Sequence, residues 1–273
     1  MDIKMIAFDL DYTLLQTGGT LSDVTKKTLA QAAAQGILLV PATGRDICEM
    51  QPLLPLLDAR YVVGVNGAVV RDLQADTVIY KELPEQNAFL EKLQLALSMG
   101  LYTEVYCDGV YTEPYSYNHM EELGMAPDQV PMFKATRTVV PDLYAVIRDM
   151  GCAEKLHILF RDADDKQKRQ EPFLHHPDFA YTNAFVNNLE LCSPKVSKAS
   201  GLAALAQHLG IERENVMTLG DGANDAAMLR WAGLGVAMEN AVEEAKAAAD
   251  CVTLSNDADG AALAISKVLR GEL

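Results

Sequence analysis

Short apolar segments separated by helical patterns are the feature that most restricts the fold of this chain. The N-terminal part contains three strand candidates, at 3–8, 37–40 and 61–65. Helical segments are predicted between them at 24–35 and 46–57, the second interrupted by two prolines. Strands that alternate with helices are typical of a parallel sheet with helices on its faces. The pattern therefore predicts an α/β fold with a Rossmann-like, doubly wound parallel sheet.

The same alternation returns near the C-terminus. Helices are predicted at 196–210, 223–231, 242–249 and 261–269, and strands at 216–219, 234–236 and 251–254. Because the two ends of the chain continue one pattern, we expect residues 1–82 and 188–273 to form a single core domain.

The segment between these two parts differs in composition. Residues 83–187 contain seven of the ten tyrosines and six of the seven phenylalanines, but only four of the 18 glycines. The segments LYTEVYC and KLHILF within it are strand candidates. We therefore expect residues 83–187 to be an inserted α/β domain with its own sheet and helices.

The overall charge restricts the partners. The net charge is −15 and the isoelectric point about 4.7, so neither a nucleic acid nor an anionic membrane surface is an expected partner. No segment approaches the roughly 20 apolar residues of a membrane-spanning helix. The segment MDIKMIAFDLD also lacks the apolar stretch of a signal peptide. We therefore expect a cytoplasmic protein.

The cysteines are scattered along the chain and form no C-x-x-C pair. They are Cys48, Cys107, Cys152, Cys192 and Cys251. This pattern favours reduced thiols over a disulfide framework or a zinc site.

Polar turns follow four of the predicted strands, at 9–11, 43–45, 66–67 and 220–225. In open parallel sheets, ligands bind beyond the carboxyl ends of the strands. The aspartates of these turns, Asp9, Asp11, Asp221 and Asp225, would converge there and repel one another. A hard divalent cation would relieve this repulsion, and Mg²⁺ prefers such oxygen ligands. The sequence therefore predicts a magnesium site at this edge of the sheet.

Two other uses of these turns fit less well. An EF-hand calcium loop starting at Asp9 would need glycine where Leu14 stands and glutamate where Thr20 stands. The turn GDGAND resembles a dinucleotide fingerprint, but Asp225 replaces its third glycine. Carboxylates in that turn would repel a pyrophosphate.

Other residues near the same strand ends could bind a phosphate. Thr43 offers a hydroxyl group and Gly44 a backbone N–H, while Lys198 stands at the start of a predicted helix. A carboxylate that faces a phosphorus atom held by such groups is placed to act as a nucleophile in phosphoryl transfer.

The motifs together resemble a known family. The pattern D-x-D-x-T at 9–13, Thr43, Lys198 and GDGAND are similar to the haloacid dehalogenase superfamily of phosphohydrolases. The segments FDLDYTLL, TGR, NGA, VSKASGLAAL and GDGANDAAM resemble its Cof-type subgroup, whose members carry a large α/β cap where this chain inserts residues 83–187. The order and spacing of the motifs carry the resemblance, which covers the whole core.

The resemblance implies a role for each residue of the acidic set. Asp9 would be the nucleophile that forms an aspartyl-phosphate, and it would also bind Mg²⁺. Asp11 would protonate the leaving oxygen and later activate water, and its backbone carbonyl would bind Mg²⁺. Asp221 would complete the metal site, and Asp225 would support the metal ligands or Lys198.

The resemblance also implies the phosphate-binding groups, which are Thr43, Gly44, Lys198 and Asn224. Tyr12 stands where the family usually has glycine, so it either faces the cap and shapes the substrate pocket or packs within the turn. Arg45 is a second candidate for shaping the substrate site.

The implied function is a Mg²⁺-dependent phosphohydrolase that acts on a small phosphorylated metabolite. The cap would determine the substrate, and its tyrosines make a phosphorylated sugar or polyol the leading class. Two alternatives stay open at this point: a phosphomutase on a similar scaffold, and a non-catalytic sugar-phosphate sensor. The presence of Asp9, Asp11 and Lys198 favours an enzyme over the sensor.

Overall fold

The computed structural model describes residues 2–151, 153–183 and 185–273. The chain divides into two compact units. The first, here called the core unit, consists of Met1–Arg45, Met50–Lys81 and Ser197–Leu273. The second, here called the insert unit, consists of Asp46–Glu49 and Glu82–Val196.

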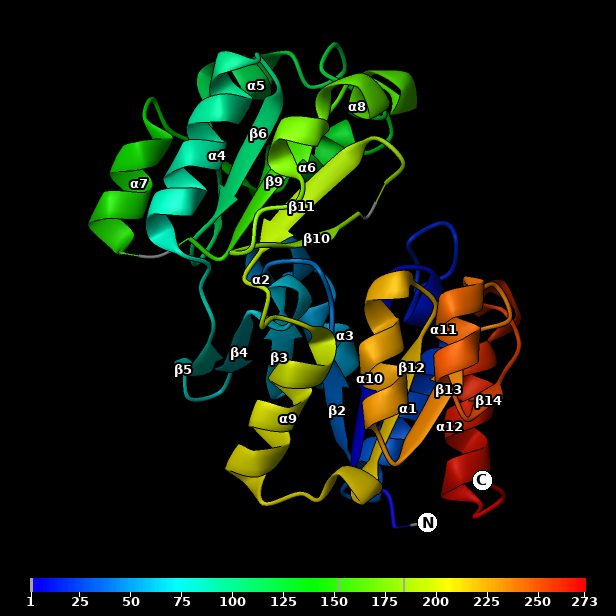
Figure 1. Ribbon diagram of the computed structural model, residues 1–273. Helices are drawn as coiled ribbons and strands as arrows, with labels where there is room; N and C mark the ends of the chain where they lie inside the picture. The colour runs from blue at the N-terminus through cyan, green and yellow to red at the C-terminus, as the bar shows by residue number, and fades with distance from the viewer. Residues whose placement is uncertain (1, 152, 184) are drawn as a thin grey trace. The chain divides into compact units, whose positions relative to one another are not determined.

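A five-stranded parallel sheet with the order β14-β13-β12-β1-β2 forms the centre of the core unit. Its strands are β1 (Met5–Phe8), β2 (Leu38–Pro41), β12 (Val216–Gly220), β13 (Leu234–Ala237) and β14 (Cys251–Val252). The chain runs from β1 outward to β2 and from β12 outward to β13 and β14, in opposite directions. Because such crossovers are right-handed, their helices lie on opposite faces of the sheet. The predicted doubly wound parallel sheet is therefore confirmed (Figure 1).

The helices of the core unit form two layers. They are α1 (Asp23–Ala34), α3 (Leu54–Leu57), α9 (Lys198–Leu209), α10 (Ala226–Trp231), α11 (Glu243–Ala248) and α12 (Gly260–Leu269). Helices α1 and α12 pack together, as do α10 and its neighbours α9 and α11 (Figure 1). The apolar core beneath α9 and α10 includes Val40, Val63, Leu202 and Met228.

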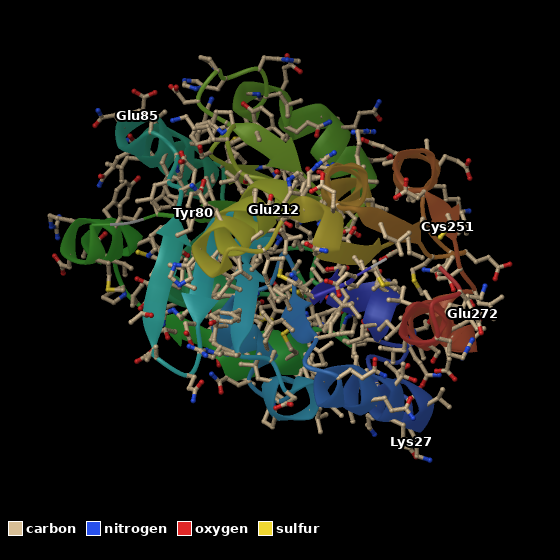
Figure 2. All side chains as sticks on the ribbon, turned by 90° about the horizontal axis from the view of Figure 1, so that it is seen from below. Lys27, Tyr80, Glu85, Glu212, Cys251 and Glu272 are labelled. Atoms are coloured by element: carbon tan, nitrogen blue, oxygen red, sulfur yellow. The ribbon has the colours of Figure 1, made fainter. Side chains whose placement is uncertain are left out.

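Helix α1 shows how the sequence sets these elements. The side chain of Ser22 accepts a hydrogen bond from the Thr25 N–H and caps the helix, as the sequence predicts. Leu29 and Ala32 are buried, whereas Lys27 points to the periphery (Figure 2). The buried and exposed positions follow the helical period, so this helix buries one face against the unit.

The third predicted strand belongs to a different sheet. Strand β3 (Tyr61–Gly64) pairs antiparallel with β4 (Val69–Asp72), and β4 pairs with β5 (Thr77–Lys81). An isolated parallel bridge from Ala42 to Val63 links β3 to the core sheet. The prediction that this strand continues the parallel sheet is therefore wrong beyond that bridge. A short turn joins β3 to β4, and a short turn joins only antiparallel strands.

The insert unit contains a six-stranded sheet with the order β10-β11-β9-β6-β7-β8. Its strands are β6 (Tyr102–Tyr106), β7 (Val110–Thr112), β8 (Arg137–Val139), β9 (Lys155–Leu159), β10 (Ala180–Thr182) and β11 (Asn188–Cys192). Its helices are α4 (Gln86–Ser98), α5 (Pro114–Asn118), α6 (Val130–Thr136), α7 (Leu143–Met150) and α8 (Ala163–Arg169), and α2 (Ile47–Met50) lies mostly in its first segment.

One face of this sheet is apolar. Phe89 of α4 and Ile147 of α7 pack with Val105, Leu156 and other buried side chains of the sheet. The strand candidates LYTEVYC and KLHILF correspond to β6 and β9.

The observed division differs from the predicted boundaries at two places. Strand β11 pairs with β9 and β10, so the insert unit extends beyond Asn187 to Val196. Residues Asp46–Glu49, predicted to lie in the core, belong to the insert unit. The pairing of β11 and the contacts of residues Asp46–Glu49 determine these boundaries. Amino-acid composition, from which the boundaries were predicted, does not report either of them.

The cysteine prediction is partly wrong. Cys48, Cys192 and Cys251 are free thiols, but Cys107 takes part in a disulfide bond. Cys152 lies outside the described residues. Among the described helices, none has the length and apolar character needed to cross a bilayer.

A close backbone contact fixes the start of α9. A Cβ atom at Gly67 would lie 2.0 Å from the Ser197 carbonyl oxygen, and one at Gly201 would lie 2.6 Å from Val63 Cγ1. Gly67 also has a φ of +102°, which side chains rarely allow. Glycine at both positions therefore lets the first turn of α9 lie directly against the turn after β3.

Gly67→Ala should destabilise the protein by roughly 3 kcal/mol, because it adds a steric clash to an unfavourable φ. Gly36→Ala is the matched control, since Gly36 has a φ of +81° and open space around its Cβ position. It should cost only about 1 kcal/mol. Urea denaturation of the three proteins measures both values. Equal losses would contradict the proposed clash.

Candidate active site

The candidate site lies where the winding of the core sheet changes direction. Asp9 directly follows β1 and Asp221 directly follows β12, and Phe8 and Leu219 are partners in the ladder between these strands. Carboxylate oxygens of Asp9, Asp221 and Asp225 lie within 4.8 Å of one another. The predicted convergence of these three acids at the carboxyl ends of the strands is thus present.

Lys198 occupies the centre of this group. Its Nζ lies 2.6 Å from Asp9 Oδ1 and 2.6 Å from Asp225 Oδ1, and its side chain is fully buried. Lys198 is the first residue of α9, where Ser197 and Ser200 form a capping box. The cap and the glycine contact described above therefore fix the backbone from which this side chain extends.

Asp225 is held on both of its oxygens. Oδ1 binds Lys198, and Oδ2 accepts hydrogen bonds from the N–H groups of Asp221 and Gly222, each at 2.8 Å. A Cβ atom at Gly220 would lie 2.5 Å from Asp225 Cβ, so glycine is needed there. Asp225 thus fixes the turn that carries Asp221, and this agrees with a supporting role.

Thr13 is a site residue to which the sequence analysis assigned no role of its own. Its Oγ1 donates a hydrogen bond of 2.6 Å to Asp221 Oδ1. The threonine of D-x-D-x-T therefore connects the turn after β1 to the turn after β12. The motif gave the signal, but the partner is 208 positions away in the sequence.

The electrostatics of the group favour an added cation. Burial raises the pKa of Asp9 to about 8, although the charge of Lys198 opposes the shift. Burial also raises the pKa of Asp221 to about 6, against its hydrogen bond from Thr13. Burial lowers the pKa of Lys198, but the charges of Asp225 and Asp9 outweigh this effect and raise it. The single ammonium group therefore does not fully compensate the loss of hydration of the buried carboxylates.

The donor set fits the predicted metal. Three carboxylates face one ammonium group, and oxygen ligands with excess negative charge suit Mg²⁺. Asp225 is already bound through both oxygens. Asp9 and Asp221 are thus the residues whose carboxylates could hold the ion.

Asp11 points elsewhere. Its carboxylate pairs with the Arg45 guanidinium, with Nε to Oδ2 at 2.9 Å and Nη2 to Oδ1 at 2.5 Å. The Asp11 side chain is 44% exposed. The structure therefore connects two predicted site residues in a way that the sequence did not suggest.

The predicted phosphate-binding residues lie around a second turn. Thr43 is buried, and its hydroxyl accepts the Arg45 N–H at 3.2 Å. Asn224 Nδ2 donates to Asn66 Oδ1 at 3.1 Å. The Asn66 N–H donates to the Thr43 carbonyl, and a Cβ at Gly44 would lie 3.0 Å from Asn66 Oδ1. Asn66 therefore joins these residues, although the analysis of the NGA segment gave it no role.

The backbone of this turn is unusual. Val65 and Asn66 both have positive φ values, of 52° and 58°. Positive φ is costly for a β-branched residue such as valine, and such conformations concentrate at functional sites.

Tyr12 also adopts a positive φ, of 58°. Its side chain is 55% exposed, and its carbonyl accepts a hydrogen bond from Asn240 Nδ2 at 2.8 Å. The side chain thus does not pack inside the turn.

Comparisons with known proteins agree with this geometry. A family model described as haloacid dehalogenase-like hydrolase matches residues 6–265. The chain is 29% identical to a 5-amino-6-(5-phospho-D-ribitylamino)uracil phosphatase of Bacillus subtilis, over 99% of each chain. It is 30% identical to another Bacillus subtilis phosphatase, over 95% of this chain and 98% of that protein.

Solved structures show the same similarity. A haloacid dehalogenase-like hydrolase from Bacteroides thetaiotaomicron has a TM-score of 0.81 and 27% identity, and the match covers 97% of this chain and 99% of that chain.

The raised pKa of Asp221 predicts a pH effect on the metal-free protein. Between pH 5 and 7 the folded protein binds more protons at Asp221 than the unfolded chain does, so its stability falls as pH rises. Relative to Asp221→Asn, the wild-type protein in chelator should lose about 1 kcal/mol over this range. Urea denaturation at several pH values measures the difference. Asp257 is the control, because hydrogen bonds from Thr17 lower its pKa and it is therefore charged in both the folded and the unfolded chain between pH 5 and 7. For Asp257→Asn the difference should stay constant over this range. A constant difference for Asp221→Asn would contradict the prediction.

Proposed function

This chain belongs to the haloacid dehalogenase-like hydrolase family, and we propose that it is a phosphatase that releases phosphate from a small phosphorylated metabolite through Asp9. The resemblance of its motifs to that family is thereby confirmed. Phosphatase relatives that match almost the whole chain support the reaction class.

The observation that carries the proposal is the position of Asp9. Its carboxylate lies at the carboxyl end of a buried strand and is held by a buried lysine, which Asp225 also holds. Asp221 lies beside it. A purely structural ion pair would need one carboxylate for one ammonium group, whereas this cluster contains three carboxylates.

In the proposed reaction, a carboxylate oxygen of Asp9 attacks phosphorus, and the bond from phosphorus to the leaving oxygen breaks. The carboxyl group of Asp11 gives its proton to that oxygen, so the product leaves as an alcohol. The carboxylate of Asp11 then takes a proton from water as the water oxygen attacks the phosphorus of the aspartyl-phosphate. Inorganic phosphate leaves and Asp9 is restored.

The remaining residues bind and orient. Lys198, Thr43, Gly44 and Asn224 would hold the phosphate oxygens. Mg²⁺, held by Asp9, Asp221 and the Asp11 carbonyl, would reduce the repulsion between the phosphate and the carboxylates.

We propose a phosphorylated sugar or polyol as the substrate class. The core motifs offer groups for phosphate and metal, so the insert unit would recognise the rest of the molecule. The Bacillus subtilis relative, named for a phosphorylated ribityl compound, supports this class. Tyr12, which follows Asp11 in the sequence, and Arg45, which pairs with the Asp11 carboxylate, would contribute from the core unit.

Asp9→Asn should lower hydrolysis of p-nitrophenyl phosphate by at least ~10³-fold, because an amide does not form the acyl-phosphate. Released inorganic phosphate is the readout, which also distinguishes a phosphatase from a phosphomutase. Glu243→Gln, at a side chain that is 94% exposed, is the control and should retain activity. A folded Asp9→Asn protein with near wild-type activity would exclude Asp9 as the nucleophile.

Removal of the metal and removal of the Asp11 carboxylate should have different effects. EDTA should abolish activity, and added Mg²⁺ should restore it. Asp11→Asn should keep Mg²⁺ affinity but lose roughly 10²–10⁴ in rate on a sugar phosphate, and less on p-nitrophenyl phosphate, whose leaving group needs little protonation. Isothermal titration and steady-state kinetics measure the two properties. Loss of Mg²⁺ binding in Asp11→Asn would make its carboxylate a metal ligand.

A further inference from the structure

A four-residue segment leaves the core unit directly after the predicted phosphate-binding turn. Asp46–Glu49 belong to the insert unit, although Arg45 before them and Met50 after them belong to the core unit. The chain therefore passes between the units at four places, whereas a simple insertion needs two. One of these passages is the peptide that joins Arg45 to Asp46.

Glu49 holds this segment within the insert unit. Its Oε1 lies 2.7 Å from Arg137 Nη1, and the two side chains are 5% and 0% exposed. Its Oε2 accepts a hydrogen bond of 2.7 Å from the Asp46 N–H. A buried carboxylate that is satisfied on both oxygens in this way is expensive to disturb.

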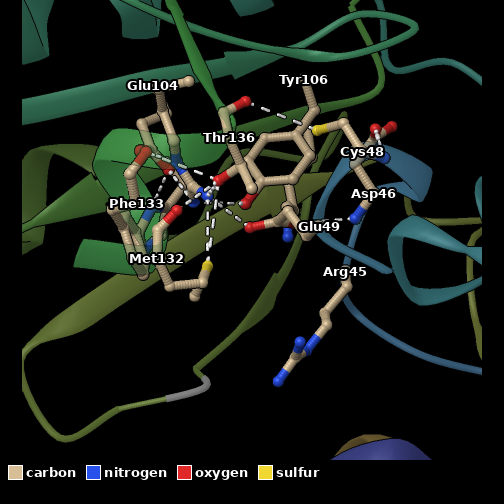
Figure 3. Close-up of polar contacts among 12 residues, drawn as sticks. Arg45, Asp46, Cys48, Glu49, Glu104, Tyr106, Met132, Phe133 and Thr136 are labelled. Carbon is tan, nitrogen blue, oxygen red and sulfur yellow. Dashed lines mark hydrogen bonds and ion pairs between the residues drawn. The ribbon is translucent and has the colours of Figure 1, made fainter. Parts of the chain in front are cut away.

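Arg137 is itself fixed by Glu104 and Thr136, two insert-unit residues that are labelled in Figure 3. Its Nε and Nη2 bind the two oxygens of Glu104 on β6 at 2.6 and 3.1 Å, and Nη1 binds Thr136 Oγ1 at 2.7 Å. Glu104 in turn accepts a hydrogen bond from the Tyr102 hydroxyl and pairs with His157 Nδ1 at 2.9 Å. The position of Glu49 is thus determined by a rigid, buried set of charges.

The peptide that joins Arg45 to Asp46 also forms a hydrogen bond within the core unit. Its carbonyl, that of Arg45, accepts a hydrogen bond of 3.0 Å from the Val65 N–H, and its N–H, that of Asp46, donates to Glu49. The Arg45 side chain then extends to Asp11, which it binds through two hydrogen bonds. A displacement of this peptide would therefore displace the guanidinium group that orients the Asp11 carboxylate.

We propose that Glu49 is a positioning residue for the phosphatase reaction: with Arg137, it fixes the peptide between Arg45 and Asp46 and so orients Arg45 against Asp11. This inference rests on the proposed role of Asp11 in proton transfer. It makes Arg45 the residue through which Glu49 influences the position of the Asp11 carboxylate.

A double-mutant cycle tests the proposal. Glu49→Ala should lower kcat on a sugar phosphate about tenfold while KM changes less than twofold, because proton transfer to the leaving group is impaired. The loss on p-nitrophenyl phosphate should be smaller. In the Arg45→Ala variant, adding Glu49→Ala should lower kcat by less than a further twofold, because Glu49 acts on the reaction through Arg45.

The matched control is Glu85, whose carboxylate accepts the Ala88 N–H at 2.7 Å and caps α4 in the insert unit, away from the Glu49 and Arg137 network. Glu85→Ala also removes a carboxylate that stabilises the insert unit, but its effect should multiply with that of Arg45→Ala. If the effects of Glu49→Ala and Arg45→Ala also multiply, Glu49 stabilises the unit without positioning Arg45, and the proposal is wrong.

Hydrogen exchange gives a readout that does not depend on activity. Amides of residues 43–47 should exchange faster in Glu49→Ala than in the wild-type protein, and Glu85→Ala should leave them unchanged. If Glu49→Ala does not fold, Glu49→Gln serves in both measurements, because its amide keeps one of the two contacts. Unchanged exchange in a folded Glu49 variant would overturn the proposal, whereas absent hydrolysis in the wild-type protein would refute only the proposed function.

Discussion

The candidate site depends on two buried ion pairs, which the Lys198 ammonium group forms with Asp9 and with Asp225. A buried charge without a partner costs several kcal/mol, so the three groups must keep their geometry together. Asp225 also binds the N–H groups that shape the turn of Asp221. The position of Asp221 thus depends on an ion pair between α9 and the turn after β12. Any cation that binds Asp9 and Asp221 therefore binds to acids that the fold has already placed.

The contact between the start of α9 and the turn after β3 keeps the buried charges of the site in place. Lys198 reaches Asp9 because α9 begins against Gly67, where a side chain would meet the Ser197 backbone. The strained conformation of Val65, a β-branched residue with positive φ, belongs to the same turn. A strained turn is tolerated where surrounding contacts hold it, and here the start of α9 holds it. The turn also carries Asn66, which links Asn224 to the Thr43 backbone.

Much of the fold and of the site could be predicted from the sequence, because short-range patterns specify them. The alternation of strands and helices predicted the parallel sheet, the strand-end motifs predicted Asp9 and Asp221, and the start of a predicted helix pointed to Lys198. Other features depend on contacts distant in sequence. The hydrogen bond from Thr13 to Asp221 and the pairing of β11 with β9 in the insert sheet have no local signature. Glu49 illustrates the limit, since its burial against Arg137 depends on a residue 88 positions later.

The ion pair between Arg45 and Asp11 has a consequence for the order of events in the proposed reaction. The two hydrogen bonds from the Arg45 guanidinium group orient the Asp11 carboxylate, but they also use both of its oxygens. For Asp11 to give a proton to a leaving oxygen, one oxygen of its carboxyl group must leave Arg45 and be protonated, while the other oxygen keeps its hydrogen bond to the guanidinium group and therefore its orientation. Because the carbonyl of Arg45 binds the Val65 N–H and the next N–H binds Glu49, the Arg45 backbone is fixed and only the side chains can rearrange. The substrate itself, by offering Arg45 an alternative oxygen acceptor, would then release that one oxygen of Asp11 for chemistry. Proton transfer would in this way be restricted to the time when a substrate is bound.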